Sequence, residues 1–189
     1  NFFDIGGDSL LSPPTYFTVV WEWESAPGDH DIAARQFTSA GVQQGGEIFL
    51  DLTDNNQSNP AISKSNRGDE WMVVWQTTFS PTDEDLYCAT VNWNGSIQNA
   101  STPLNTSTAN ETNPAVSSPL GVDRYLTAYK SGNQIGLTLS NAVTVLQHSS
   151  LETLGDNPFA KPRFEPCVDA DGGKFIVGYS EQFGNDLTD

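Results

Sequence analysis

The stretch Phe17-Thr-Val-Val-Trp21 decides the fold, because a close copy, Trp71-Met-Val-Val-Trp75, begins 54 residues further along the chain. Both copies are short runs of β-branched and aromatic residues, which is typical of a strand buried on both faces. The match continues without a gap to Asn59-Pro-Ala-Ile-Ser63 and Asn113-Pro-Ala-Val-Ser117. A fixed period of this kind is the signature of a repeat architecture.

The repeat divides the chain into serial units. We expect a non-repeat segment at 1–15, units over 16–63, 64–117 and 118–160, and a partial unit over 161–189. The strand pattern of the second unit begins at 59 and that of the third at 113. A loop of the third unit is about six residues shorter, which aligns the small residue Gly136 with Ala34 and Cys88.

The second unit predicts four strands, near 59–63, 71–77, 85–91 and 98–104. Tight turns join them, and proline stands only at strand starts and in loops, so the unit reads as an antiparallel meander. No segment has convincing helical periodicity. We therefore predict an all-β, β-propeller-like array of about three and a half four-stranded blades, which is part of a larger ring or assembly.

The units resemble the propeller repeats, roughly fifty residues long, of large bacterial secreted and cell-surface proteins. Those repeats run Asn-Pro-Ala, a Val-Val-Trp strand, Asp-Ile-x-Ala-x-x-Phe and a Gly turn. Asp31-Ile-Ala-Ala-Arg-Gln-Phe37, Gln57-Ser-Asn-Pro-Ala61 and Val73-Val-Trp-Gln76 carry the resemblance here. It covers 16–117 well and 118–189 weakly, and it implies a fold rather than a chemistry.

Composition narrows the function classes. The 24 acidic and 8 basic residues give a net charge of −16. Nucleic-acid binding needs a basic footprint and anionic lipid attracts cations, so we expect no nucleic-acid partner and no attraction to anionic lipid. No apolar run approaches the roughly 20 residues that a membrane span requires, so we expect no membrane insertion. Few lysines and arginines with abundant Thr, Ser, Asn and Gly are typical of an exported β-protein. We expect an extracellular or cell-surface location and treat the chain as a mature product or a fragment.

Aromatic residues fall into two groups. One position recurs in four successive units, which favours a wedge in the core between blades over a ring of sugar-stacking platforms; its residues are Trp21, Trp75, Tyr129 and Tyr179. Trp23 and Trp93 lie outside this register, so they are the candidates for a ligand-binding surface.

Three acidic pairs are candidate calcium ligands, because alternating carboxylates on a tight loop supply part of the oxygen set that calcium needs. The pairs are Asp29 with Asp31, Asp83 with Asp85, and Asp169 with Asp171. The alternative is that these aspartates cap turns and keep strand ends soluble. His30 and His148 have no metal-ligand spacing, so we expect no zinc site.

Other motifs are weaker. Asn-x-Ser/Thr sequons are possible modification sites if the source glycosylates; they stand at Asn56, Asn94, Asn99, Asn105 and Asn110. Cys88 is expected to be a small buried residue, without a disulfide to Cys167. The stretch from Asn1 to Leu11, with Gly6-Gly-Asp-Ser9, resembles the attachment motif of carrier proteins, but the helical bundle that such a protein needs is missing. Gly7-Asp-Ser-Leu10 resembles the nucleophile block of an esterase family, but the base histidine is missing.

The sequence therefore predicts a non-catalytic extracellular module for adhesion or for binding a glycan or protein. The alternatives are a structural subunit of a filament or surface layer, and the propeller domain of a larger secreted hydrolase. The expected partners are further blades of the same chain or other subunits, and a glycan or surface protein. No set of catalytic residues stands out, so we expect no enzyme activity.

Overall fold

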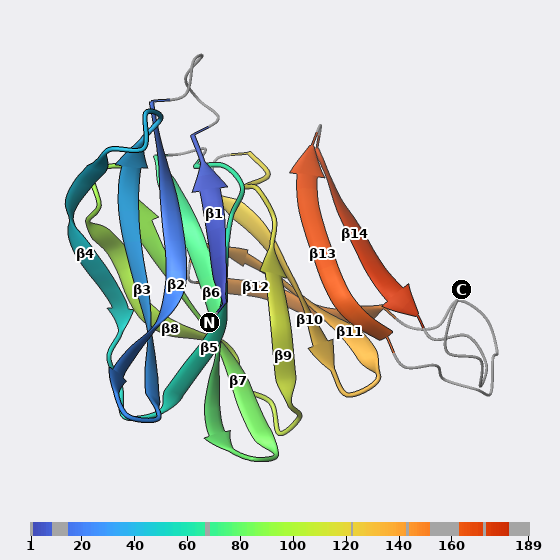
Figure 1. The fold of residues 1–189 in the computed structure, drawn as a ribbon. Coiled ribbons are helices and arrows are strands. Elements are labelled where there is room, and N and C mark those ends of the chain that lie inside the picture. Colours follow the sequence, from blue (N-terminus) through green and yellow to red (C-terminus); the bar gives the residue numbers. More distant parts are fainter. Residues whose placement is uncertain are drawn as a thin grey trace.

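The computed structural model describes residues 2–8, 15–66, 69–121, 123–142, 144–151, 163–171 and 173–181, which form an all-β fold (Figure 1). No helix in these residues is long and apolar enough to cross a membrane. The strands are β1 (Phe3–Gly7), β2 (Tyr16–Ala26), β3 (Asp29–Thr38), β4 (Gln43–Asp51), β5 (Asn56–Ile62), β6 (Glu70–Ser80), β7 (Asp83–Asn92), β8 (Ile97–Asn105), β9 (Glu111–Val116), β10 (Arg124–Ser131), β11 (Gln134–Asn141), β12 (Thr144–Leu151), β13 (Arg163–Asp171) and β14 (Lys174–Glu181).

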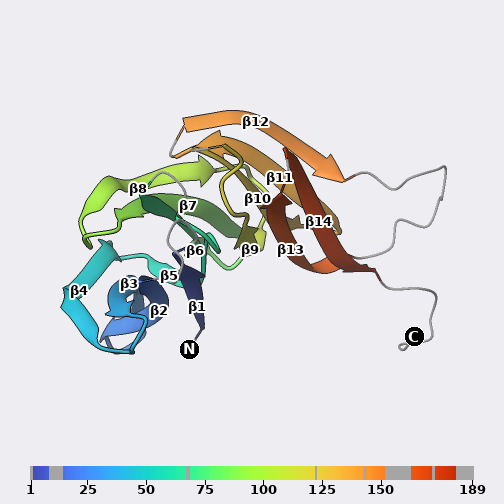
Figure 2. The same ribbon diagram turned by 90° about the horizontal axis from the view of Figure 1, so that it is seen from above.

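The strands form four sheets of antiparallel neighbours in chain order. Sheet one is β1–β4, sheet two β5–β8, sheet three β9–β12, and sheet four the pair β13–β14. The predicted all-β class with antiparallel meanders is thus confirmed. Seen from above, β1, β5, β9 and β13 lie toward the middle, and β4, β8 and β12 lie at the periphery (Figure 2). Each inner strand contacts the next one along this series.

The sheets pack face to face through three apolar cores. The first core, between sheets one and two, includes Val20, Ile32, Trp71 and Trp75. The second lies between sheets two and three, and the third between sheets three and four. Sheet two is covered on both faces, so its central strands must be apolar on both. This explains why Trp71–Trp75 is a continuous buried run rather than an alternating one.

The inner strands β5, β9 and β13 share a β-bulge that β1 lacks. The bulge falls at Asn59-Pro60, Asn113-Pro114 and Glu165-Pro166, and the residue before each proline has a φ of 50°, 53° and 51° respectively. Asparagine adopts positive φ more readily than most residues, and proline lacks the N–H that a regular ladder would use. A residue with positive φ followed by proline therefore marks these three inner strands, with asparagine in β5 and β9 and glutamate in β13.

The structure corrects the expectation that 1–15 stands outside the repeat. Within that segment β1 pairs with β2 residue by residue, from Phe3 opposite Trp21 to Gly7 opposite Phe17. Backbone pairing does not require the Asn-Pro signature, because β1 forms its ladder without the bulge. Gly6 also packs closely, since a Cβ there would meet the Ser63 carbonyl oxygen at 2.5 Å.

The four aromatic residues expected in the core do not all lie there. Trp75 is fully buried and Tyr129 is 3% exposed. Trp21 is only half-buried, and Tyr179 is 39% exposed, which corrects its assignment to the core. The reason is position: Trp21 lies on the outward face of sheet one, and Tyr179 lies on β14, which pairs only with β13 among the described strands.

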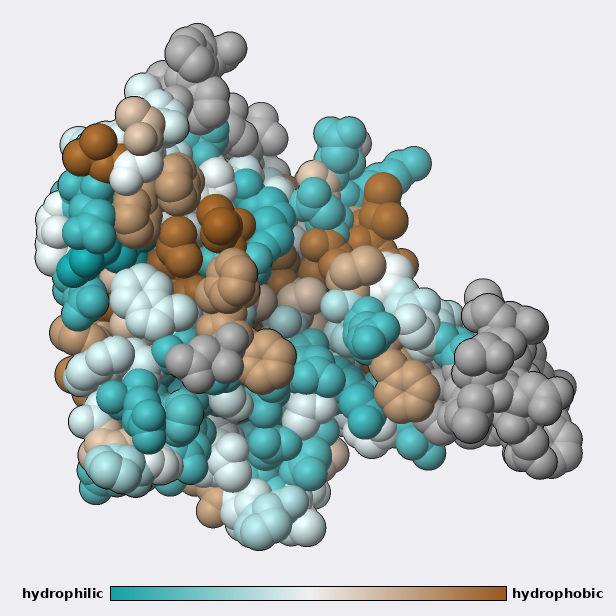
Figure 3. Space-filling view, in the orientation of Figure 1, coloured by the Kyte–Doolittle hydropathy of each residue, from teal (hydrophilic) through white to brown (hydrophobic). Residues whose placement is uncertain are grey.

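The outward face of sheet one is apolar and uncovered by any described sheet. Ile5 there is 45% exposed, whereas its counterparts on the other inner strands, Ile62, Val116 and Val168, are 0%, 2% and 9% exposed. Figure 3 shows apolar side chains gathered over β1–β3 on this face. In every later sheet the corresponding face packs against the preceding sheet.

Candidate functional site

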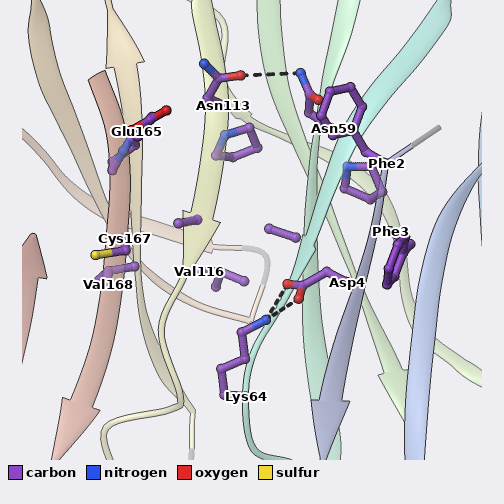
Figure 4. Close-up of a pocket in the computed structure, with 15 residues that line it drawn as sticks. Phe2, Phe3, Asp4, Asn59, Lys64, Asn113, Val116, Glu165, Cys167 and Val168 are labelled. Carbon is purple, nitrogen blue, oxygen red and sulfur yellow. Dashed lines mark hydrogen bonds and ion pairs between the residues drawn. The ribbon is translucent and has the colours of Figure 1, made fainter. Parts of the chain in front are cut away.

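The inner strands of the four sheets line a hollow of about 500 Å³ (Figure 4). Each strand contributes the residues around its bulge, or around the matching position of β1. The lining residues are Phe2, Phe3, Asp4, Asn59, Pro60, Ala61, Lys64, Asn113, Pro114, Ala115, Val116, Glu165, Pro166, Cys167 and Val168. We call this hollow the inner groove. Its volume lies in the range of small-ligand sites.

Polar groups gather where the bulges lie. Asn59 Nδ2 donates to Gln76 Oε1 at 2.7 Å and lies 3.5 Å from Asn113 Oδ1. The neighbouring counterpart, Glu165, is exposed, and its Oε2 accepts a hydrogen bond from Ser180 at 3.3 Å. Two amides and a carboxylate thus occupy equivalent positions around the groove. The prolines that follow them hold these side chains on rigid backbone.

A charged group lies at another part of the groove. Lys64 forms an ion pair with Asp4, whose Oδ2 also accepts the Ile62 backbone N–H at 3.0 Å. Burial alone would raise the pKa of Asp169, but hydrogen bonds from Ser118 and Ala170 and the charge of Lys64 bring it below its ordinary value. The positive charge of Lys64 therefore interacts with carboxylates on two different inner strands, Asp4 on β1 and Asp169 on β13.

The remaining lining is apolar, with two exposed aromatic rings. Phe2 is 60% and Phe3 is 69% exposed, while the prolines and alanines between them and β13 form the floor. Aromatic faces beside fixed amides and a carboxylate suit ligands that carry both hydroxyl or amide groups and apolar faces. The two carboxylates of the lining differ in their partners, since Asp4 forms an ion pair with Lys64 and Glu165 accepts a hydrogen bond from Ser180.

The sequence did not single out these groove residues. The recurrence of Asn59-Pro and Asn113-Pro could have pointed to them, but this pattern is equally typical of the start of a strand. Only the arrangement of the sheets brings β1, β5, β9 and β13 together.

The six predicted calcium ligands lie in three separate places. Asp29 and Asp31 lie on β3, Asp83 and Asp85 on β7, and Asp169 and Asp171 on β13. In the described part of the chain, no group of three or more His, Cys, Asp and Glu side chains is placed to hold a metal ion. Asp169 instead accepts backbone N–H groups from Ser118 and Ala170, which is a structural role.

The tryptophans predicted to bind a ligand also lie apart. Trp23 is half-buried and packs against Phe49, with ring centroids 4.8 Å apart. Trp93 is 51% exposed and lines a separate hollow with Tyr16 and Asp69. Neither residue lines the inner groove.

The sequons differ in what their amides do. Asn99 and Asn105 donate their side-chain N–H groups to Thr90 and to the Tyr129 hydroxyl. Asn56 and Asn110 accept backbone N–H groups of the preceding sheet through Oδ1, while Asn94 is exposed in the turn after β7. Cys88 is buried, Cys167 is exposed, and both thiols are free. Ser9 lies outside the described residues.

Comparison with known proteins supports the fold and goes no further. No protein-family model and no curated protein sequence matches the chain. Among solved structures, it is similar to an α-L-arabinofuranosidase from Lactobacillus brevis, with a TM-score of 0.51 and 13% sequence identity. The match covers 92% of this chain and 63% of that one, so this chain spans less than two thirds of its neighbour. At this identity the likeness shows the all-β fold alone.

Proposed function

We propose that the four sheets are blades of a β-propeller, and that the protein is a non-catalytic extracellular module that binds a ligand in its inner groove. One observation carries this proposal: the inner strands of four successive sheets lie side by side and line one hollow of about 500 Å³. A glycan is the ligand that the lining suits best. Sugar rings offer apolar faces to Phe2 and Phe3 and hydroxyl groups to Asn113 and Glu165.

Binding, rather than catalysis, is the role that the groove charges support. Asp4 is neutralised by Lys64, which leaves Glu165 as the exposed carboxylate beside the bulges. Glycoside hydrolysis requires two carboxyl groups in distinct protonation states across the scissile bond. The alternative of a propeller domain in a larger secreted hydrolase rests on the likeness to an arabinofuranosidase. In that case this chain would supply a substrate-binding surface.

The outward face of sheet one suggests that the protein has further sheets as partners. Ile5 is 45% exposed where its three counterparts are covered by a preceding sheet. A large uncovered apolar surface marks an interaction site. We propose that additional blades, from the same chain or from another subunit, cover this face. Adhesion at a cell surface or assembly into an extracellular structure would both use such a contact.

A glycan array probed with the 189-residue chain, followed by calorimetric titration of each hit, tests the proposal. Asn113→Gly removes a groove amide yet tolerates the positive φ at that position, so the backbone keeps its conformation. This variant, combined with Phe2→Ser, should weaken binding about tenfold or more, as expected when contacts worth about 1.4 kcal/mol are lost. Trp93→Ser, on the separate hollow, should bind like the parent protein.

Two results would contradict the proposal. The first is the absence of saturable binding to any glycan on the array. The second is release of nitrophenol from 4-nitrophenyl α-L-arabinofuranoside by the purified chain, which would mean catalysis. Loss of binding in Trp93→Ser, with the groove variant unaffected, would move the site to the Trp93 hollow.

A further inference from the structure

A row of buried oxygen atoms crosses sheet two on the face that packs against sheet one. Gln57 on β5 pairs with Thr77 on β6, and Thr77 pairs with Asp85 on β7, so the three side chains are neighbours on one face. They are 0%, 3% and 8% exposed. Thr77 lies two residues after Trp75, which packs in the core between sheets one and two.

Each member of this row has an oxygen without a hydrogen-bond partner among the described residues. These atoms are Gln57 Oε1, Thr77 Oγ1 and Asp85 Oδ1. Unpaired buried polar atoms are rare in native proteins, and each one calls for an explanation such as an ion or a buried water. Three of them on adjacent side chains indicate one shared cause.

Sheet one brings a second carboxylate to the same interface. Asp51, at the end of β4, is 6% exposed; its Oδ2 accepts a hydrogen bond from Ser101 at 2.9 Å. Its Oδ1 accepts the Thr53 N–H at 3.2 Å, and Thr53 Oγ1 in turn accepts from Gln57 Nε2 at 2.7 Å. Burial is the main cause of the raised pKa of Tyr87, and the charges of Asp85 and Asp51 add to it.

No lysine or arginine in the described ranges forms an ion pair with either carboxylate; the ion pairs found there are Arg35–Glu47 and Lys64–Asp4. Buried charges are usually paired or bound to a metal. The row offers oxygen atoms only, from two carboxylates, an amide and a hydroxyl. Calcium takes six to eight ligands of this kind, whereas zinc prefers nitrogen and sulfur.

We propose that a calcium ion binds between sheets one and two, held by Asp85, Gln57 and Thr77 from sheet two and by Asp51 from sheet one. Backbone carbonyl groups or water complete its coordination. The ion ties the two sheets together, because its ligands come from both. Of the six aspartates that the sequence offered as calcium ligands, this site uses Asp85 alone.

Asp31 provides a matched control within the same chain. It stands at the position of Asp85 in the first repeat, is 2% exposed, and its Oδ1 likewise has no partner among the described residues. However, Asp31 pairs with Trp23 where Asp85 pairs with Thr77. Among the described residues, β1 pairs with β2 from Phe17 to Trp21, so none of them pairs with Trp23 as Gln57 pairs with Thr77. Asp31 therefore has no counterpart of Thr77 and Gln57 beside it among the described residues, although the charge of Asp51 adds to the rise in the pKa of Asp31 that burial causes.

Thermal unfolding of the chelator-treated full chain, with added CaCl2 or MgCl2, tests the site. At calcium concentrations about 100-fold above Kd, binding to the folded state should raise Tm by roughly 5 to 10 °C. Magnesium should act more weakly, because it demands octahedral geometry. Asp85→Asn should abolish the calcium shift, and Asp31→Asn should retain it. Thr77→Val, which keeps the side-chain shape, should weaken calcium affinity by about tenfold while the protein still folds.

An unchanged Tm of the parent protein in millimolar calcium would overturn the proposal. A full calcium shift in both Asp85→Asn and Thr77→Val would overturn it as well. Stabilisation by Asp85→Asn, in a parent that ignores calcium, would instead assign the row to a neutral carboxyl group hydrogen-bonded to Gln57. Calorimetric titration with calcium alone should give one site per chain.

Discussion

Glu22 Oε1 accepts a hydrogen bond from the backbone N–H of Asn59 at 2.9 Å, across the interface between sheets one and two. The next interface repeats this bond, since Gln76 Oε1 accepts the N–H of Asn113 at 3.1 Å. Both donors belong to the bulge that leads into the inner groove. At the third interface the equivalent residue is Lys130, whose ammonium group cannot accept a hydrogen bond. Its Nζ lies over the Phe164 ring, 5.4 Å from the ring centroid.

Removal of the Glu22 acceptor should destabilise the protein. Glu22 is 7% exposed, so Glu22→Ala leaves the Asn59 N–H without its acceptor at a site with little access to water, which costs about 1 to 3 kcal/mol. Glu22→Gln should restore most of this loss, because the amide oxygen accepts the same bond, as it does in Gln76. Urea denaturation measures the difference, with exposed Glu24→Ala as the control. Equal stability of Glu22→Ala and the parent would contradict this role.

Gly136 should be intolerant of any side chain. A Cβ at this position would meet the Tyr129 ring at 2.3 to 2.4 Å, well inside van der Waals contact. Gly136→Ala must displace the buried ring, which typically costs about 1 to 3 kcal/mol. Gly46→Ala, where nothing lies within 4 Å of the added methyl group, should change stability by no more than about 0.5 kcal/mol. Thermal unfolding of the two variants provides the comparison.

Glu111 should make folding less favourable at neutral pH than in acid. Burial raises its pKa, and the charges of Asp85 and Asp83 add to the effect, although a hydrogen bond from Ser107 opposes it. A raised pKa means that the folded state holds the proton more tightly than the unfolded state. The contribution to stability is therefore full below the unfolded pKa of about 4.3 and is lost as pH rises through the folded value.

Glu111→Gln removes this titration and copies Gln57, its counterpart in the second sheet. At pH 7 the variant should match or exceed the parent in stability, by about 0.5 to 2 kcal/mol, and the gain should shrink toward pH 4. Chemical denaturation across this pH range measures it. A gain that grows as the pH falls would show that the sign is wrong.

The two cysteines should differ sharply in reactivity. Burial raises the pKa of Cys88 to about 12, so its thiolate is scarce and shielded at neutral pH. Cys167 is exposed and lines the inner groove. A thiol reagent such as DTNB should titrate one thiol in the native protein and both in denaturant. A bulky maleimide on Cys167 should also block glycan binding, and two fast native thiols would contradict the buried position of Cys88.

The sequence predicted the strands of the second unit closely because each is short and bounded by turn residues, and because 71–77 and 85–91 are rich in apolar residues. Its expected first and third strands, 59–63 and 85–91, fall within or beside β5 and β7. It missed β1, since Phe3–Gly7 carries neither the Asn-Pro bulge nor a continuous apolar run. Pairing with β2 is a long-range property that local pattern does not contain.

The expected match between the second and third repeats is wrong by one residue in sheet three. It places Gly136 at the position of Cys88, whereas Gly136 pairs with Tyr129 as Tyr87 pairs with Trp75, so Gly136 is the counterpart of Tyr87. A slip of one position moves a side chain to the opposite face of the sheet. This is why Gly136 contacts the Tyr129 ring rather than a neighbouring sheet. The groove residues could not be assembled from sequence for a related reason, because they are brought together only by the packing of whole sheets.

The link from Glu22 to Asn59 and from Gln76 to Asn113 has a consequence for how such chains evolve. At the first two interfaces one side chain accepts a hydrogen bond from one backbone amide of the next sheet, and that amide is present whatever non-proline residue occupies the bulge. A duplicated segment of one repeat, 54 residues long, would carry both its own acceptor side chain and its own backbone amide. Gene duplication could therefore lengthen the array one sheet at a time, leaving each inherited copy free to diversify the side chain it presents to the groove.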